Sequence, residues 1–221
     1  MTNQAATEID LWSRVTDMLG AGGKRLGPRW SSQLHRNPIE LALTLAWAKF
    51  AAKMACVGRN VLELGCDEGI RSPILSELAT CYVGLDSDDA AIAAAESNWI
   101  GPRRSFVAGP WLERTQGTFQ TVVCHDVGPY RRDDSYNSFL ETVLASLDDD
   151  GLCVLGLRVG DGADLPSAAH DIQRLTDSCS RSFRRVLRFG MNDGLVHTRC
   201  TPAAEHVILL GVCPQAKGID R

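Results

Sequence analysis

Short apolar runs alternate with segments of helical spacing along most of the chain. Runs of this kind, bounded by glycines or acids, are typical of strands buried in a parallel sheet. Five strands are predicted, at residues 61–64, 81–85, 105–108, 119–124 and 152–157. Helices are predicted at residues 6–19, 38–54, 72–79 and 168–179, in a segment capped by Ser87, and in one striped by Tyr136, Leu140, Val143 and Leu147. Residues 20–28 are expected to form a loop and residues 149–151 a turn. This alternation predicts a parallel sheet with helices on both faces.

The end of the chain breaks this rhythm. Residues 183–189 and 206–212 are predicted to be strands, with no segment long enough for a helix between them. Such a pair forms an antiparallel hairpin at one edge of the sheet. The predicted fold is therefore α/β: a Rossmann-like, doubly wound sheet, mostly parallel, with an antiparallel C-terminal edge hairpin and N-terminal helices. A single domain is expected for residues 1–221, with a helical cap at 1–57 and a core at 58–213.

Composition narrows the class of protein. The chain has 221 residues and a net charge of −4, which gives no basic footprint for nucleic acid. No apolar run approaches the length needed to span a membrane, and residues 1–10 do not resemble a secretory signal. The eight cysteines stand apart without a Cys-x-x-Cys pair, so we expect small core residues rather than disulfides or zinc ligands. A cytoplasmic location is expected.

The run at residues 61–64 contains one acid, Glu63, and ends at a loop with Gly65 and Gly69. A buried carboxylate needs a partner, and glycines let a backbone turn sharply beside a ligand. At the end of a parallel strand that partner is a cationic or hydroxylated ligand, or alternatively the backbone amides of a neighbouring loop. Asp86 ends the second strand about 20 residues further on, where a ribose hydroxyl would be held. The alternative role for Asp86 is that of an acid at a helix N-terminus.

These features resemble class I S-adenosylmethionine-dependent methyltransferases, whose signature is an acid-x-Gly-x-Gly-x-Gly loop. Here the loop is Glu63-Leu-Gly-Cys-Asp-Glu-Gly69, with Asp67 in place of the central glycine. The resemblance spans residues 37–212. Residues 37–54 and the segment Met191-Asn-Asp-Gly-Leu-Val-His-Thr198 are similar to a bacterial subgroup associated with sugar and surface-glycan biosynthesis, which residues 203–206 follow loosely.

The resemblance implies S-adenosyl-L-methionine as the cofactor and no metal. It also implies a set of cofactor-binding residues: Glu63, Gly65, Cys66, Asp67, Gly69, Asp86, Ser87, Pro110, Trp111 and His125. Within this set, Trp111 is expected to be a pocket wall or a core residue rather than a catalytic group.

The substrate side departs from the subgroup. After the fourth strand, Asp126-Val-Gly-Pro-Tyr130 stands where the subgroup has Asp-Val-Ile-Glu-His, and residues 158–167 lack an expected His-Asn pair. A hydroxyl acceptor needs a base. His197 is the first candidate, oriented by Asp193, and the alternative is that it is a hydrogen-bonded hairpin histidine. His125 and Tyr130 are the second candidates. The pair at residues 131–132 is either a solvated helix start or a contact for a nucleotide-sugar phosphate.

Three functions remain open from the sequence. The first is methyl transfer to a small molecule, such as a sugar or a nucleotide-activated sugar. The second is a cofactor-binding protein without catalysis that serves as a partner or regulator. The third, a dinucleotide-dependent oxidoreductase, is disfavoured because the loop lacks Gly-x-Gly-x-x-Gly spacing. The expected partners are a small-molecule substrate and either a second copy of the chain or another protein, but neither nucleic acid nor a membrane.

Overall fold

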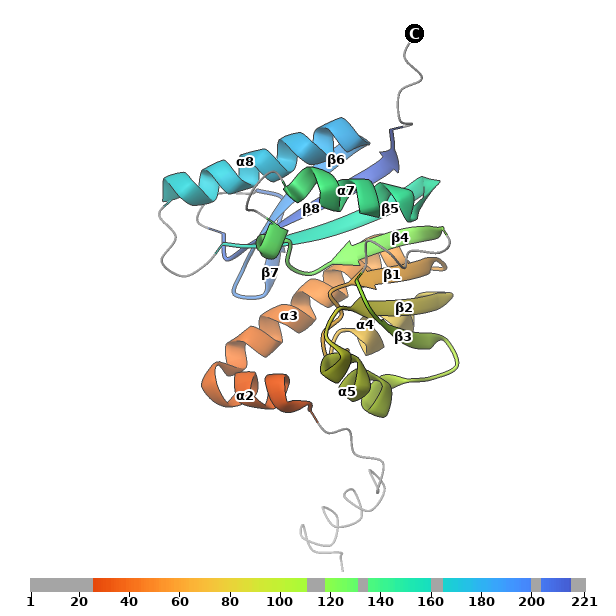
Figure 1. The fold of residues 1–221 in the computed structure, drawn as a ribbon. Helices are drawn as coiled ribbons and strands as arrows, with labels where there is room; N and C mark the ends of the chain where they lie inside the picture. The colour runs from red at the N-terminus through yellow and green to blue at the C-terminus, as the bar shows by residue number, and fades with distance from the viewer. Residues whose placement is uncertain (1–25, 111–117, 131–134, 160–164, 200–203, 216–221) are drawn as a thin grey trace, which may run out of the picture.

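An eight-stranded sheet runs through the molecule in the order β3-β2-β1-β4-β5-β8-β6-β7 (Figure 1). The computed structural model describes residues 26–110, 118–130, 135–159, 165–199 and 204–215, so the expected helix at 6–19 lies outside the described residues. The strands are β1 (Asn60–Leu64), β2 (Cys81–Asp86), β3 (Arg104–Ala108), β4 (Phe119–Cys124), β5 (Leu147–Arg158), β6 (Phe183–Asn192), β7 (Leu195–His197) and β8 (His206–Pro214). All seven strands predicted from the sequence are present.

The pairing confirms the predicted fold class. Strands β3, β2, β1, β4 and β5 are parallel, whereas β8 runs antiparallel to both β5 and β6. The last strand, β8, lies inside the sheet between β5 and β6. The short edge strand β7, which follows a turn from β6, was not predicted.

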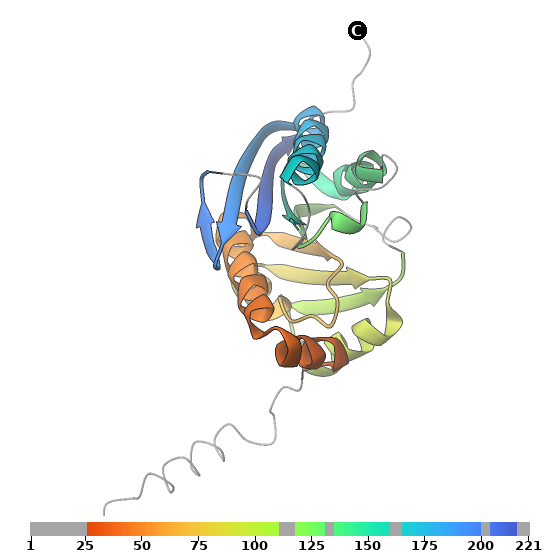
Figure 2. The ribbon, with the colours of Figure 1, turned by 90° about the vertical axis from the view of Figure 1, so that its left-hand side faces the viewer.

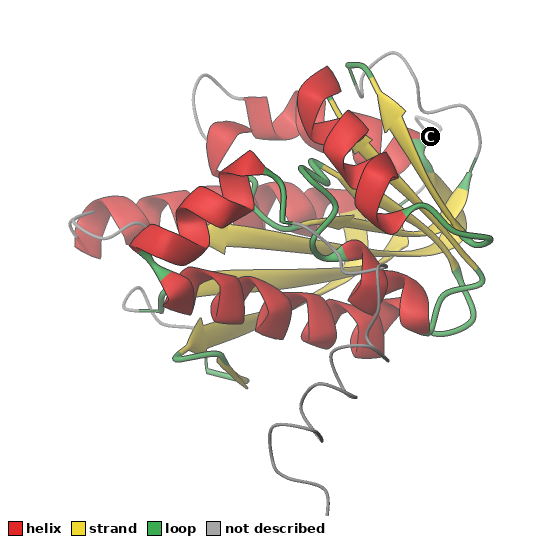
Figure 3. Ribbon diagram, turned by 90° about the horizontal axis from the view of Figure 1, so that it is seen from below, coloured by secondary structure: helices red, strands yellow, loops and turns green. Residues whose placement is uncertain are grey.

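Helices cover both faces of the sheet (Figures 2 and 3). They are α2 (Pro28–Arg36), α3 (Pro38–Ala51) with a π-helical turn at Ala52–Cys56, α4 (Ser72–Glu77), α5 (Asp89–Trp99), a 3₁₀ turn at Gly128–Tyr130, α7 (Ser135–Ala145) and α8 (Leu165–Ser182). One hydrophobic core joins the sheet to α7 and α8, and a second joins it to α3, α4 and α5. Because side chains alternate along a strand, Val61 packs in the second core while Leu62 and Leu64 pack in the first.

Three local predictions are wrong. Ser87 does not cap α5: Asp88 does, because its Oδ1 accepts hydrogen bonds from the backbone N–H groups of Ala90 and Ala91 at 2.9 and 3.3 Å. Leu147 is not part of a helical stripe, because it already pairs with Phe119 as the first residue of β5. For the same reason residues 149–151 lie within β5 rather than in a free turn.

None of the helices that the structure describes is long and apolar enough to cross a bilayer. The seven described cysteines carry free thiols, and five of them are buried.

Candidate functional site

The loop after β1 is shaped by three residues with positive φ angles. Gly65, Asp67 and Gly69 have φ values of 70°, 54° and 73°. This left-handed conformation is natural for glycine and strained for most other residues. Asp67 therefore adopts the backbone of the glycine that it replaces in the signature. A side chain at Gly69 would also collide with Trp99, whose Cδ1 lies 2.9 Å from the position of a Cβ atom.

A buried ion pair between Glu63 and Arg71 stabilises this loop. The Glu63 carboxylate accepts hydrogen bonds from Arg71 Nε and from the Tyr82 hydroxyl, and Arg71 Nη2 donates to the carbonyl of Gly65 at 2.7 Å. Glu63 is fully buried, and this burial raises the pKa of its carboxyl against the opposing effect of Arg71. The geometry therefore fits the alternative of a loop-ordering acid and turns Glu63 away from solvent. Sequence reasoning missed Arg71.

Asp86 connects the loop to the start of α5. Its Oδ2 accepts the backbone N–H of Asp67 at 2.8 Å, and its Oδ1 accepts that of Asp88 at 3.0 Å. The side chain is half-buried at the end of β2, directly beside the end of β1. It therefore lies at the position expected from the sequence and also organises both loops around it.

Helix α2 is attached to the same loop. The Glu68 carboxylate accepts the backbone N–H groups of Arg29 at 2.9 Å and of Trp30 at 3.1 Å, which satisfies two donors at the start of the helix. The side chain of Arg29 reaches Asp67 at 2.7 Å and Asp88 at 3.3 Å. Gly27 is required just before the helix, since a Cβ atom there would lie 2.3 Å from Cδ of Glu68.

A cavity of about 200 Å³ lies between this loop, helices α2 and α3, and the carboxyl ends of β4 and β5. Its lining residues are Arg29, Trp30, Gln33, Glu40, Thr44, Asp67, Arg71, His125, Asp126 and Arg158. Two of the predicted site residues, Asp67 and His125, meet here. At the opposite wall, Arg158 Nη2 pairs with Glu40 Oε2 at 2.9 Å.

Buried polar atoms without hydrogen-bond partners gather around this cavity. Among the described residues they include Trp30 Nε1, Thr44 Oγ1, Trp47 Nε1, His125 Nε2 and both ring nitrogens of His206. The His125 ring packs against Trp47 and His206, with centroid distances of 5.0 and 5.5 Å. Leaving such a group unpaired costs about 1–3 kcal/mol, so their concentration marks a place built for polar ligands or water.

The two histidines are neutral near pH 7. Burial, reinforced by the charges of Arg71, His206 and Arg158, lowers the pKa of His125 well below its ordinary value of 6.5. Burial also lowers the pKa of His206, to about 4, with a further contribution from Arg158. A neutral imidazole keeps one nitrogen able to accept a proton.

Comparison with solved structures identifies the fold. The TehB-like SAM-dependent methyltransferase from Corynebacterium glutamicum matches 85% of this chain and all of its own, with a TM-score of 0.61 and 18% identity. The N-methyltransferase NodS from Bradyrhizobium japonicum, solved with S-adenosyl-L-homocysteine, matches 83% of this chain and 91% of its own, with a TM-score of 0.58 and 18% identity. This chain has the class I methyltransferase fold.

Sequence comparison adds a short match. A probable S-adenosylmethionine-dependent methyltransferase from Mycolicibacterium smegmatis is 39% identical over 44 residues, which is 20% of this chain and 17% of that relative's length. No protein-family model matches the chain.

Within this methyltransferase fold, the other predicted site residues lie as follows. Asp193 and His197 are exposed at the outer edge of the sheet, where β5, β8 and β6 separate them from β4 and His125. The structure therefore does not bring His197 together with the cavity. Tyr130 belongs to the 3₁₀ turn after β4, and Pro110 ends the described segment after β3. Trp111 and the pair at residues 131–132 lie outside the described residues.

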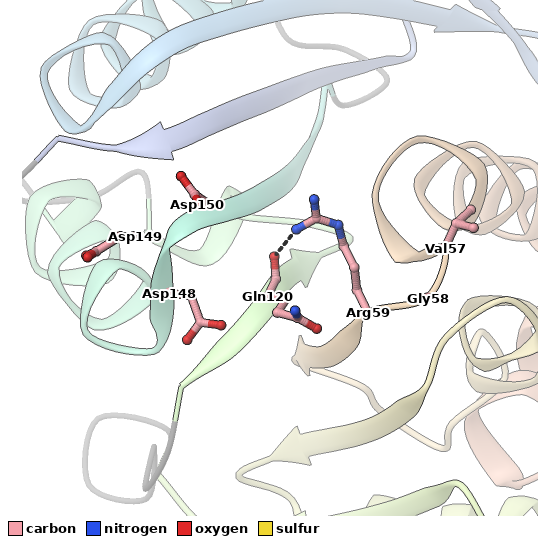
Figure 4. Close-up of a pocket in the computed structure, with 7 residues that line it drawn as sticks. All are labelled: Val57, Gly58, Arg59, Gln120, Asp148, Asp149 and Asp150. Atoms are coloured by element: carbon pink, nitrogen blue, oxygen red, sulfur yellow. Dashed lines mark hydrogen bonds between the residues drawn. The ribbon is translucent and has the colours of Figure 1, made fainter.

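A larger hollow, of about 580 Å³, lies at the opposite end of the sheet (Figure 4). It is lined by Val57, Gly58, Arg59, Gln120, Asp148, Asp149 and Asp150. Arg59 Nη1 donates to the carbonyl of Gln120 at 3.2 Å. Ligands of open α/β sheets bind at the carboxyl ends of the strands, whereas this hollow lies at the amino ends of β1, β4 and β5. The larger volume of this hollow therefore does not make it the candidate functional site. Among the described residues, no group of His, Cys, Asp or Glu is arranged to hold a metal ion.

Proposed function

We propose that this protein is an S-adenosyl-L-methionine-dependent methyltransferase that acts on a small molecule. The carrying observation is the cavity at the carboxyl ends of β1, β4 and β5, where the glycine loop, three carboxylates and the unpartnered His125 ring meet. The class I methyltransferase fold and the methyltransferase name of the 44-residue match support the assignment.

The residues around the loop fit this cofactor. Asp86 holds the two adjoining loops through one hydrogen bond to each oxygen, and each oxygen retains a lone pair for a ribose hydroxyl. Asp126 lines the cavity and favours a cationic sulfonium, whereas Asp67 and Glu40 already pair with Arg29 and Arg158. In this proposal Gly65, Cys66 and Gly69 shape the backbone around the cofactor, and Ser87 and Pro110 lie toward its adenine end. Glu63 contributes from below by ordering the loop.

When bound, the cofactor supplies an activated methyl group. The chain's own task is to hold the acceptor close and aligned, which provides several kcal/mol. His125 is the proposed base because this residue lines the cavity, its Nε2 is unpartnered and its ring is neutral. Its lowered pKa makes it a weak base, so it is expected first to orient the acceptor hydrogen and to take the proton only as the new bond forms.

A sugar, free or nucleotide-activated, is the proposed acceptor class. Its support is the resemblance of residues 37–54 and 191–198 to the sugar-associated subgroup. These two segments pack together, since a Cβ atom at Gly194 would lie 3.6 Å from the Cβ of Ala46. Beside them, the rings of Phe50 and Phe189 pack at 5.0 Å.

Calorimetry with S-adenosyl-L-methionine, S-adenosyl-L-homocysteine and NAD tests the cofactor. Binding of the first two and not of NAD is expected, and Asp86→Ala should weaken that binding at least tenfold. Turnover to S-adenosyl-L-homocysteine with sugars, nucleotide sugars and amines tests the reaction. Selective binding of NAD would overturn the proposal. His125→Asn should abolish turnover, whereas His197→Ala should retain it. The reverse result would assign the role of base to His197 instead of His125.

The second candidate is a cofactor-binding partner or regulatory protein without turnover. Two observations favour it: the Glu-His pair of the subgroup is absent after β4, and Arg29 bridges Asp67 and Asp88 across the loop. Tight cofactor binding without turnover on any acceptor, together with co-purification of a second protein, would select this candidate.

A further inference from the structure

The cavity beside the glycine loop is lined by three buried side chains that each carry an unpartnered polar atom. Trp30, Thr44 and His125 are 7%, 0% and 8% exposed, and all three line the cavity. They come from α2, α3 and the end of β4, so distant parts of the chain converge on one place. We call these three residues the acceptor recess.

Trp47 and His206, which lie behind the recess, form no hydrogen bond with its unpartnered polar atoms. Trp47 and His206 pack against the His125 ring, and their own nitrogens are also buried and unpartnered. An indole N–H only donates, whereas a threonine hydroxyl and a neutral imidazole can donate and accept. The recess therefore matches a ligand with several hydroxyl oxygens, which both accept and donate, or with ether oxygens, which accept.

Charge around the recess is already matched within the protein. Of the three lining arginines, Arg29 pairs with Asp67, Arg71 with Glu63 and Arg158 with Glu40. The carboxylate of Asp126 accepts the backbone N–H of Gly128 at 2.8 Å. Among the residues that the structure describes, a phosphate or carboxylate entering here would find no lining arginine without a carboxylate partner and would lie near three acids.

We propose, building on the methyltransferase function above, that the acceptor recess binds an uncharged, hydroxyl-bearing group such as a sugar ring, and discriminates against a phosphate or carboxylate at that position. The hydroxyl to be methylated lies beside His125, and Trp30 and Thr44 hold neighbouring oxygens. A nucleotide sugar would be accepted only with its diphosphate outside the recess.

Matched pairs of ligands test the charge preference. Glucose, mannose and myo-inositol are compared with their monophosphates, and glucose with UDP-glucose, by calorimetry and saturation-transfer NMR on the protein loaded with S-adenosyl-L-homocysteine. At least one neutral compound is expected to bind about tenfold or more tightly than its phosphate. Equal or tighter binding of every phosphate, or no binding of any neutral compound at millimolar concentration, overturns the inference.

Two variants that keep side-chain shape test the residues. Thr44→Val and Trp30→Phe each remove one polar atom and should weaken binding of the neutral compound up to about tenfold, with affinity for S-adenosyl-L-homocysteine unchanged. Ser72→Ala is the matched control, because the Ser72 hydroxyl is also buried and unpartnered but does not line the cavity. If both recess variants weaken the cofactor instead, the recess belongs to the cofactor and the inference fails.

The two proposals fail in different ways. Absence of cofactor binding in the wild-type protein overturns the methyltransferase function. The comparison of neutral and phosphorylated ligands on the unloaded protein then still decides whether the recess prefers uncharged groups.

Discussion

Oε1 of Glu68 lies 2.9 Å from the backbone nitrogen of Arg29, so a residue of the glycine loop caps a helix 39 positions earlier in the chain. The side chain of Arg29 returns the contact by pairing with Asp67 in the same loop. Asp67 and Glu68, the two neighbouring acids of this loop, therefore have a common role: they attach α2 to the loop.

Glu68→Gln should loosen α2 without disturbing the rest of the fold. The change removes the carboxylate that accepts two N–H groups of the first helical turn, and the expected loss of stability is about 1–2 kcal/mol. Hydrogen exchange should accelerate in Pro28–Arg36 while β1 and β4 stay protected. The control is Glu77→Gln at the exposed end of α4, and equal exchange in the two variants would argue against the cap.

Asp67→Gly should change stability little. Glycine relieves the left-handed backbone but gives the unfolded chain more freedom and removes a pair whose arginine is 57% exposed. Asp193→Gly is the control because Asp193 has a similar φ of 50° without that pair. Urea unfolding should show that Asp67→Gly and Asp193→Gly change the free energy of unfolding by amounts that agree within about 1 kcal/mol. A much larger loss at Asp67 would show that this carboxylate does more than hold Arg29.

Arg71→Met should be severely destabilising. It leaves the Glu63 carboxylate fully buried without its cationic partner, and removing one member of such a pair costs about 3–5 kcal/mol. The measurement is chemical unfolding, with the exposed Arg188→Met as control. Adding Glu63→Gln to Arg71→Met should recover part of the loss, and a double variant less stable than Arg71→Met alone would contradict a paired role.

His206 should make the protein less stable in mild acid. Its pKa is about 4 in the folded state against 6.5 as the ordinary value, so the unfolded chain binds more protons between these pH values. The contribution to stability is complete above pH 6.5, falls as the pH decreases toward 4, and levels off below that. The slope contributed by one such group approaches about 1.4 kcal/mol per pH unit.

Urea unfolding at pH 7, 6 and 5 measures this slope. His206→Gln should flatten it relative to the wild type, whereas His35→Gln, at an exposed position of α2, should leave it unchanged. An unaltered slope in His206→Gln would assign the acid sensitivity to other groups, of which His125 is the first to test.

The alternation of strands and helices was enough to predict the sheet because its central strands, β1, β4 and β5, have consecutive buried residues and carry short apolar runs. Helix α2 escaped prediction because its nine residues contain only two large apolar side chains, Trp30 and Leu34, which is too short a pattern to identify a helix. The insertion of β8 between β5 and β6 also could not be read from periodicity, because a hydrophobic pattern identifies a strand without naming its neighbours.

The same limits explain which site residues were found. The positions of Asp67, Asp86 and His125 follow from their places at strand ends, which parallel topology brings to one edge. Thr44 and Arg71 carry no local signal, because their roles depend on partners, or on the lack of partners, that only the folded chain reveals. His197 was favoured by a late motif, but it lies in the edge strand β7, which β5, β8 and β6 separate from β4.

Because β8 lies inside the sheet, the site is complete only when this last strand is in place. His206, which backs the His125 ring, can take its place only when the final strand has been threaded between two strands made earlier in synthesis. A nascent chain that stops before residue 206 could form the glycine loop yet would lack the rear wall of the acceptor recess. In order of synthesis, the residues of the glycine loop thus precede the strand that carries His206.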